Sequence, residues 1–107
     1  MDRGQAVVIF VTTSSPAEAE KIARALVEEK LVACANILLQ VHSIYRWKEK
    51  ICDEPEALMV LKTRSGRIQK IIQRVRSLHS YTVPEIIALA ILAGSKEYLR
   101  WIQEVTR

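Results

Sequence analysis

The chain has 107 residues, of which 50% are hydrophobic and 26% are charged, with three glycines and three prolines. This composition excludes a disordered or low-complexity chain and predicts a single globular domain over residues 1–107 with a modest core. The net charge of +4 permits an acidic partner but does not require one. The densest basic group, in residues 64–76, is expected to form the solvent face of a helix.

The two cysteines, Cys34 and Cys52, form no CxxC pair, which excludes a zinc ribbon or a thioredoxin-type motif. They are also too few for a disulfide framework in a chain of this size. We therefore expect a reduced, cytoplasmic protein. The apolar run at residues 6–11 is too short to span a bilayer, and no convincing cleavage site follows it, so this run is predicted to be a buried strand.

The first two predicted elements are a buried strand and a helix. Residues 6–11, AVVIFV, are continuously apolar and rich in β-branched side chains, as in a central strand that is buried on both faces. A capping box follows, with Ser15 as the N-cap, Pro16 at the first helical position and Glu18 three residues after the cap. Apolar residues then recur at helical spacing, which predicts a helix to about Lys30.

Residues 32–50 change to a period of two, which predicts one long strand. Apolar and aromatic side chains share one parity, whereas Gln40, His42 and Arg46 share the other. A strand of about 15 residues is longer than the usual five or six. Its overhang must therefore bend, bulge or pair with another chain.

The rest of the chain predicts two more strands and two more helices. KEKICDEP is expected to form a turn, residues 56–63 a strand, residues 65–78 a helix and residues 86–92 a fourth core strand. Gly94 ends that strand, and Ser95 can cap a last helix whose inward residues are predicted to be Tyr98, Trp101, Ile102 and Val105. The order β-α-β-β-α-β-α is the split βαβ or ferredoxin-like plan of an α/β (α+β) protein, with an added C-terminal helix.

Fingerprints of common enzymes and nucleotide sites do not occur in the sequence. No GxSxG, P-loop, GxGxxG or HExxH motif is found, and the two histidines lie far apart. Nucleophilic catalysis would require Cys34 or Cys52 beside a histidine, which only a fold could arrange, so we expect no enzymatic activity. Nucleic-acid binding is not expected either, because residues 6–11 offer only Phe10 for base stacking and residues 56–63 offer no aromatic side chain.

The stretch HSYTVPE, which begins at His79, has two interpretations. Imidazole and thiolate suit copper and zinc, so His79 is a candidate metal ligand, with Cys34, Cys52 or a symmetry-related chain supplying further ligands. Alternatively, the stretch is a structural corner. The residue before Pro84 favours extended backbone and would start the next strand. Tyr81 would then bury its ring, and its hydroxyl would form a hydrogen bond.

Several separated stretches resemble the CutA divalent-cation-tolerance proteins. The family pattern contains Cys-x-Asn, Ser-x-Tyr-x-Trp, Lys-Thr, His-Pro-Tyr-x-x-Pro-Glu and Tyr-x-x-Trp in this order. The matching stretches are KLVACANI (30–37), SIYRWKEKI (43–51), LKTR (61–64), HSYTVPEIIAL (79–89) and YLRWI (98–102). The resemblance covers nearly the whole chain, with two departures: Ser80 replaces the usual proline, and Glu49 stands where a glycine commonly follows Trp47.

The resemblance implies a homotrimer of ferredoxin-like subunits, similar in build to the PII signalling proteins, in which the overhang of the long strand pairs across subunits. It also implies a role in tolerance of copper (Cu²⁺) or another divalent metal ion, with no required cofactor and no established reaction. Copper ligands proposed for a bacterial member fall on Val11, Leu78 and His79, of which only His79 can bind a metal. The residues expected to line the inter-subunit cleft are Cys34, Lys62, His79, Tyr81 and Glu85.

A second hypothesis is a PII-like signalling or structural trimer without enzymatic activity. Lys62 and the basic residues in 64–76 motivate it, because they could attract a small anionic ligand to the clefts or a partner protein to the surface. On either hypothesis we expect neither a nucleic-acid nor a membrane partner.

Overall fold

The computed structural model describes residues 4–107, and its elements follow the predicted order. They are β1 (Ala6–Thr13), α1 (Pro16–Glu28), β2 (Cys34–Trp47), β3 (Lys50–Arg64), the 3₁₀ turn η1 (Ser65–Arg67), α2 (Ile68–Leu78), β4 (Ile86–Ala90) and α3 (Lys96–Val105). The strands form one antiparallel sheet in the order β2-β3-β1-β4. This is the predicted ferredoxin-like arrangement, with α3 as the additional element.

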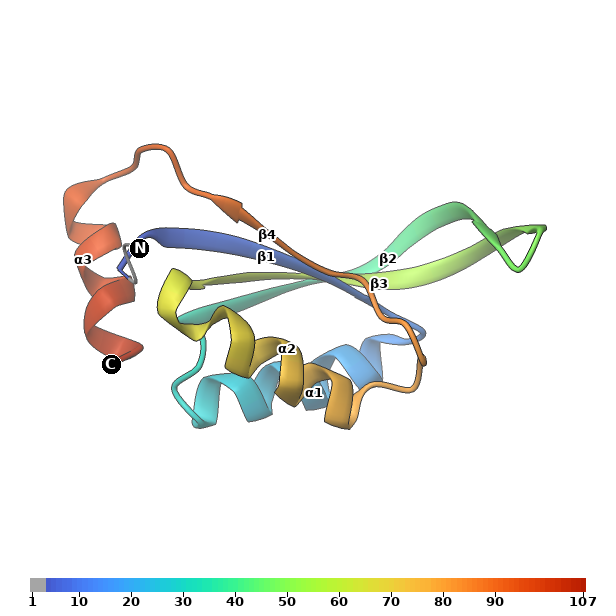
Figure 1. The fold of residues 1–107 in the computed structure, drawn as a ribbon, viewed down its shortest axis with the longest axis horizontal. Helices are drawn as coiled ribbons and strands as arrows, with labels where there is room; N and C mark the ends of the chain where they lie inside the picture. The colour runs from blue at the N-terminus through green and yellow to red at the C-terminus, as the bar shows by residue number, and fades with distance from the viewer. Residues whose placement is uncertain (1–3) are drawn as a thin grey trace.

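Helices α1 and α2 lie against the same face of the sheet (Figure 1). Helix α3 lies at one end of the sheet, and the β2–β3 hairpin projects at the other end (Figure 1). In this projecting part, residues 41–47 of β2 pair with residues 50–56 of β3, which have no partner on β1. We call residues 41–56 the hairpin arm. The overhang that the period-two pattern predicted is therefore present, and within one chain it pairs only with itself.

The core lies between the sheet and its two helices. Alternate residues of β1 and β3 point toward α1 and α2, because successive side chains of a strand point to opposite faces. The largest fully buried apolar side chains are Ile9, Val11, Ile22, Leu26, Val32, Met59, Leu61, Ile71, Val75 and Ile102. Burying one side chain of this size stabilises the folded chain by about 1.5–3 kcal/mol.

The start of α1 confirms the predicted cap. The Ser15 hydroxyl accepts a hydrogen bond of 3.2 Å from the Glu18 amide, and Pro16 occupies the first turn. The Glu18 carboxylate reaches back to Ser14, from whose amide and hydroxyl it accepts bonds of 3.2 and 3.0 Å. The Glu18 amide is one of the N-terminal amides that lack an intrahelical partner, and the contact with Ser14 fixes the residue before the cap.

The turn prediction for KEKICDEP is wrong. Strand β3 begins at Lys50, six residues before the expected start at Glu56, and the turn is confined to Lys48 and Glu49, whose φ angles are 50° and 64°. Proline and charge usually mark turns, but Pro55 lies beside a register shift between Leu38 and Val41, where the ladder is interrupted.

Strand β4 is not the core strand that its apolar sequence predicted. It pairs only with β1, so it lies at the edge of the sheet, and it ends at Ala90. The face opposite α1 and α2, here called the open face, carries a series of apolar residues. They are Val8, Phe10, Leu38, Leu58, Val60, Ile87 and Leu89. Of these, Leu38, Ile87 and Leu89 are about half exposed in the single chain.

Helix α3 contributes less to the core than its periodicity predicted. Ile102 is buried, but Tyr98 and Trp101 are 43% and 39% exposed and contact each other with tilted rings whose centres are 5.4 Å apart. The helix is attached at its C-terminal end instead. Arg64 and Arg67 donate hydrogen bonds of 2.9 and 2.7 Å to the Thr106 carbonyl, an acceptor that the helix itself leaves unpaired.

Candidate functional site

The corner after α2 holds His79 in a fixed position. His79 caps the helix with extended backbone, and its imidazole is completely buried. The Tyr81 amide donates to Nδ1 at 3.0 Å, so Nδ1 is an acceptor, and Nε2 lies 2.7 Å from the Thr12 carbonyl. Because a carbonyl can only accept, Nε2 carries the proton. Nε2 therefore ties the corner to β1, and Nδ1 holds the turn between His79 and Tyr81.

Glu18 fastens the same corner to α1. Its carboxylate accepts a 2.7 Å hydrogen bond from the Ser80 amide, and its Oε2 lies 3.9 Å from Nδ1 of His79. Burial alone would raise the pKa of this carboxyl, but the hydrogen bonds from Ser80 and Ser14 together outweigh burial and lower it. The ionised carboxylate is thus the form that stabilises the folded chain. Ser80, the departure from the family's proline, supplies the amide hydrogen that a proline lacks.

Tyr81 connects the corner to β3. Its hydroxyl donates a 2.7 Å hydrogen bond to Oε2 of Glu56, a residue only 7% exposed, and its ring lies 4.8 Å from the His79 ring. Burial, and then the bond to Glu56, raise the pKa of the Tyr81 hydroxyl. Tyr81 is therefore a neutral hydrogen-bond donor rather than a proton acceptor at ordinary pH.

A cavity of about 620 Å³ opens beside this corner, between the corner and the hairpin arm. The side chains on its wall that matter for chemistry are Tyr45, Trp47, Glu56, Tyr81, Val83 and Glu85. Burial, and then the nearby charge of Glu56, raise the pKa of the Glu85 carboxyl. The predicted cleft residues Tyr81 and Glu85 do lie together, and the structure adds Glu56 to them.

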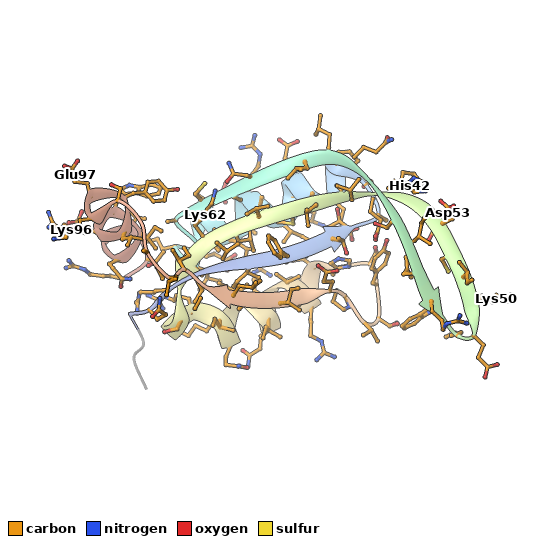
Figure 2. All side chains as sticks on the ribbon, turned by 90° about the horizontal axis from the view of Figure 1, so that it is seen from above. His42, Lys50, Asp53, Lys62, Lys96 and Glu97 are labelled. Atoms are coloured by element: carbon orange, nitrogen blue, oxygen red, sulfur yellow. The ribbon has the colours of Figure 1, made fainter. Side chains whose placement is uncertain are left out.

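The hairpin arm carries two polar cross-strand pairs. His42 contacts the Asp53 carboxylate, and the Tyr45 hydroxyl donates to Glu54. Figure 2 shows His42 and Asp53 where the arm leaves the sheet, with Lys50 at its tip. Sequence reasoning singled out none of these pairs, nor Glu56. The alternation of residues 41–47 could have indicated these pairs, because it determines which side chains lie on the same face of the arm.

A second polar cluster lies on the open face, toward α3. Cys34 and Lys62 are directly opposite each other in the β2–β3 register, and both donate to the Asn36 side-chain carbonyl, Cys34 at 3.5 Å. Burial, and then the neighbouring Cys34 sulfur, raise the pKa of the Tyr98 hydroxyl. Figure 2 shows Lys62 on the part of the sheet that faces α3. The predicted cleft residue Lys62 is six residues along β3 from Glu56, about 20 Å away.

The family model described as CutA1 divalent ion tolerance protein matches residues 7–105 of the chain. The chain belongs to this family. Two curated relatives agree. The divalent-cation tolerance protein CutA of Thermus thermophilus is 46% identical over 99 residues, which are 92% of this chain and 96% of that protein. Protein CutA of Mus musculus is 44% identical over 103 residues, which are 96% of this chain but only 58% of the mouse protein.

Solved structures of CutA1 family members have the same fold. The Cut A1 protein from Thermus thermophilus superimposes with a TM-score of 0.93 at 45% identity, covering 95% of this chain and 99% of that chain. The CutA described as periplasmic from Archaeoglobus fulgidus superimposes with a TM-score of 0.92 at 41% identity, with the same coverage of both chains. The recognised pattern of short motifs therefore reflects one shared fold over nearly the whole domain.

Metal ligands that the sequence suggested are not brought together within one chain of this CutA1 family member. Cys52 pairs with Tyr45 on the arm and Cys34 with Lys62, so the two cysteines lie ten residues apart in the β2–β3 register, roughly 33 Å measured along the strand. His79 lies beside Thr12, near the end of β1. Within residues 4–107, no group of three or more His, Cys, Asp or Glu residues is arranged to hold a metal ion. A complete metal site in one subunit does not fit these residues.

Among the described residues of the CutA1 domain, none of the helices has the length and apolar character required to cross a bilayer.

Proposed function

We propose that this CutA1 family member acts in divalent-cation tolerance as a non-enzymatic homotrimer that binds copper, or another divalent ion, weakly. Membership of the family and the names of its relatives support the metal-related role. The two free cysteines support a reducing compartment, and we propose the cytoplasm.

The open face is the observation that supports the proposed trimer. Monomeric proteins rarely leave a continuous apolar surface of this extent in water. Here seven apolar residues of four strands share one uncovered face, and the arm adds Ile44 and Ile51, which are 66% and 70% exposed. Neighbouring copies would cover the open face and the arm together, and this would stabilise an arm that one chain supports only through the β2–β3 pairing.

Metal binding in such an assembly would use ligands from more than one subunit. One chain supplies isolated donors: the Cys34 thiol on the open face, the Cys52 thiol on the arm and the His79 imidazole. Both thiols are free and partly exposed, whereas His79 would have to give up its contacts with Thr12 and Tyr81 before it could coordinate an ion. We therefore rank the cysteines above His79 as ligands. Weak binding follows, because each subunit offers few donors.

A small anionic ligand is the second candidate, and it has less support. The cavity beside Tyr81 and Glu85 is lined by carboxylates, and no lysine or arginine of the described chain contributes to its wall. Lys62 lies elsewhere on the sheet and bonds to Asn36. A partner protein on the basic face of α2 is compatible with either function.

The experiment combines sedimentation with metal titration of the reduced protein. We expect a trimer for the wild type and a smaller species for Leu89→Glu, which places a charge on the open face. Calorimetric titration with Cu²⁺, and with redox-inert Zn²⁺, is expected to lose affinity in Cys34→Ser or Cys52→Ser and to keep it in a folded His79→Gln variant. A monomeric wild type would refute the trimer, and unchanged affinity in both serine variants would refute thiol ligation.

A further inference from the structure

We draw no further inference here: the strongest candidate, the apolar groove between α1 and the outer edge of β2 that is lined by Val27, Ile37 and Leu39, carries none because nothing in the structure shows what covers it.

Discussion

The Tyr81 hydroxyl donates a 2.7 Å hydrogen bond to the carboxylate of Glu56, 25 residues earlier in the chain. This bond joins the corner after α2 to β3 at the point where the hairpin arm begins. Glu56 is only 7% exposed, so hydrogen-bond donors of the protein must replace the water that its carboxylate loses on folding.

Removing this donor should destabilise the protein. Tyr81→Phe leaves a buried carboxylate without its hydroxyl donor, and we expect the free energy of unfolding to fall by about 1.5–3 kcal/mol in urea denaturation. Tyr45→Phe is the matched control, because it removes the analogous hydroxyl from the exposed Glu54 on the arm and should change stability much less. Equal effects of the two substitutions would contradict the structural role of the Tyr81–Glu56 bond.

His79 should behave as a structural residue. His79→Ala removes contacts at both ring nitrogens and leaves a cavity under the corner, so we expect it to lower the free energy of unfolding by about 2–4 kcal/mol. His79→Gln can still reach one of these partners and should lose less. Full stability of His79→Ala combined with lost metal affinity would instead identify His79 as a ligand.

The tip of the hairpin arm is strained at Glu49. Its φ of 64° lies in the left-handed region, where a side chain costs about 1 kcal/mol relative to glycine. Glu49→Gly should therefore raise the free energy of unfolding by about 1 kcal/mol in chemical denaturation. Glu49→Ala removes the same charge but keeps the Cβ atom, and it should give no such gain. A gain of equal size in both variants would attribute the effect to charge rather than to backbone conformation.

Glu18 and Glu85 should affect the pH dependence of stability in opposite directions. The pKa of Glu18 in the folded chain is lowered from its ordinary value of 4.5. The ionised carboxylate therefore stabilises the folded chain above pH 4.5, and this stabilisation is lost as the pH falls through the folded pKa. The folded pKa of Glu85 is raised, mainly by burial, so ionisation costs stability as the pH rises from 4.5 through the folded pKa.

Urea denaturation of two glutamine variants between pH 3 and pH 8 measures this difference. At pH 7, Glu18→Gln should be less stable than the wild type and Glu85→Gln more stable. The ionisation-dependent part of each difference should shrink toward acid pH, where both carboxyls are protonated in the folded and unfolded chains. A stabilising Glu18→Gln or a destabilising Glu85→Gln at pH 7 would contradict the assigned directions.

Local patterns in the sequence predicted most of the elements. The capping residues Ser15 and Glu18 act over one helical turn, and the period-two pattern of residues 32–50 acts between neighbouring residues of one strand. Both predictions hold because the interactions behind them are short in sequence. The error at KEKICDEP has the same origin, since proline and charge indicate a turn only when no partner strand lies alongside, and β2 does.

The candidate site depended on contacts that are distant in sequence. The motif HSYTVPE was recognisable, but nothing local to it shows that His79 bonds to Thr12 or that Tyr81 reaches Glu56. The apolar residues of β4 and α3 were predicted to be buried, but several of them are exposed in the single chain. Hydrophobic periodicity identifies an apolar face without identifying what covers it.

The sequence by itself determined the order of elements, the start of α1, the family and the unusual length of the second strand, because each depends on residues within a few positions of one another or on motifs along the chain. Only the tertiary structure decided that β4 is an edge strand, that an apolar face stays open and that Glu56 and Glu85 share a cavity with three aromatic rings. These properties come from the pairing of strands far apart in the chain, and that pairing sets which side chains meet.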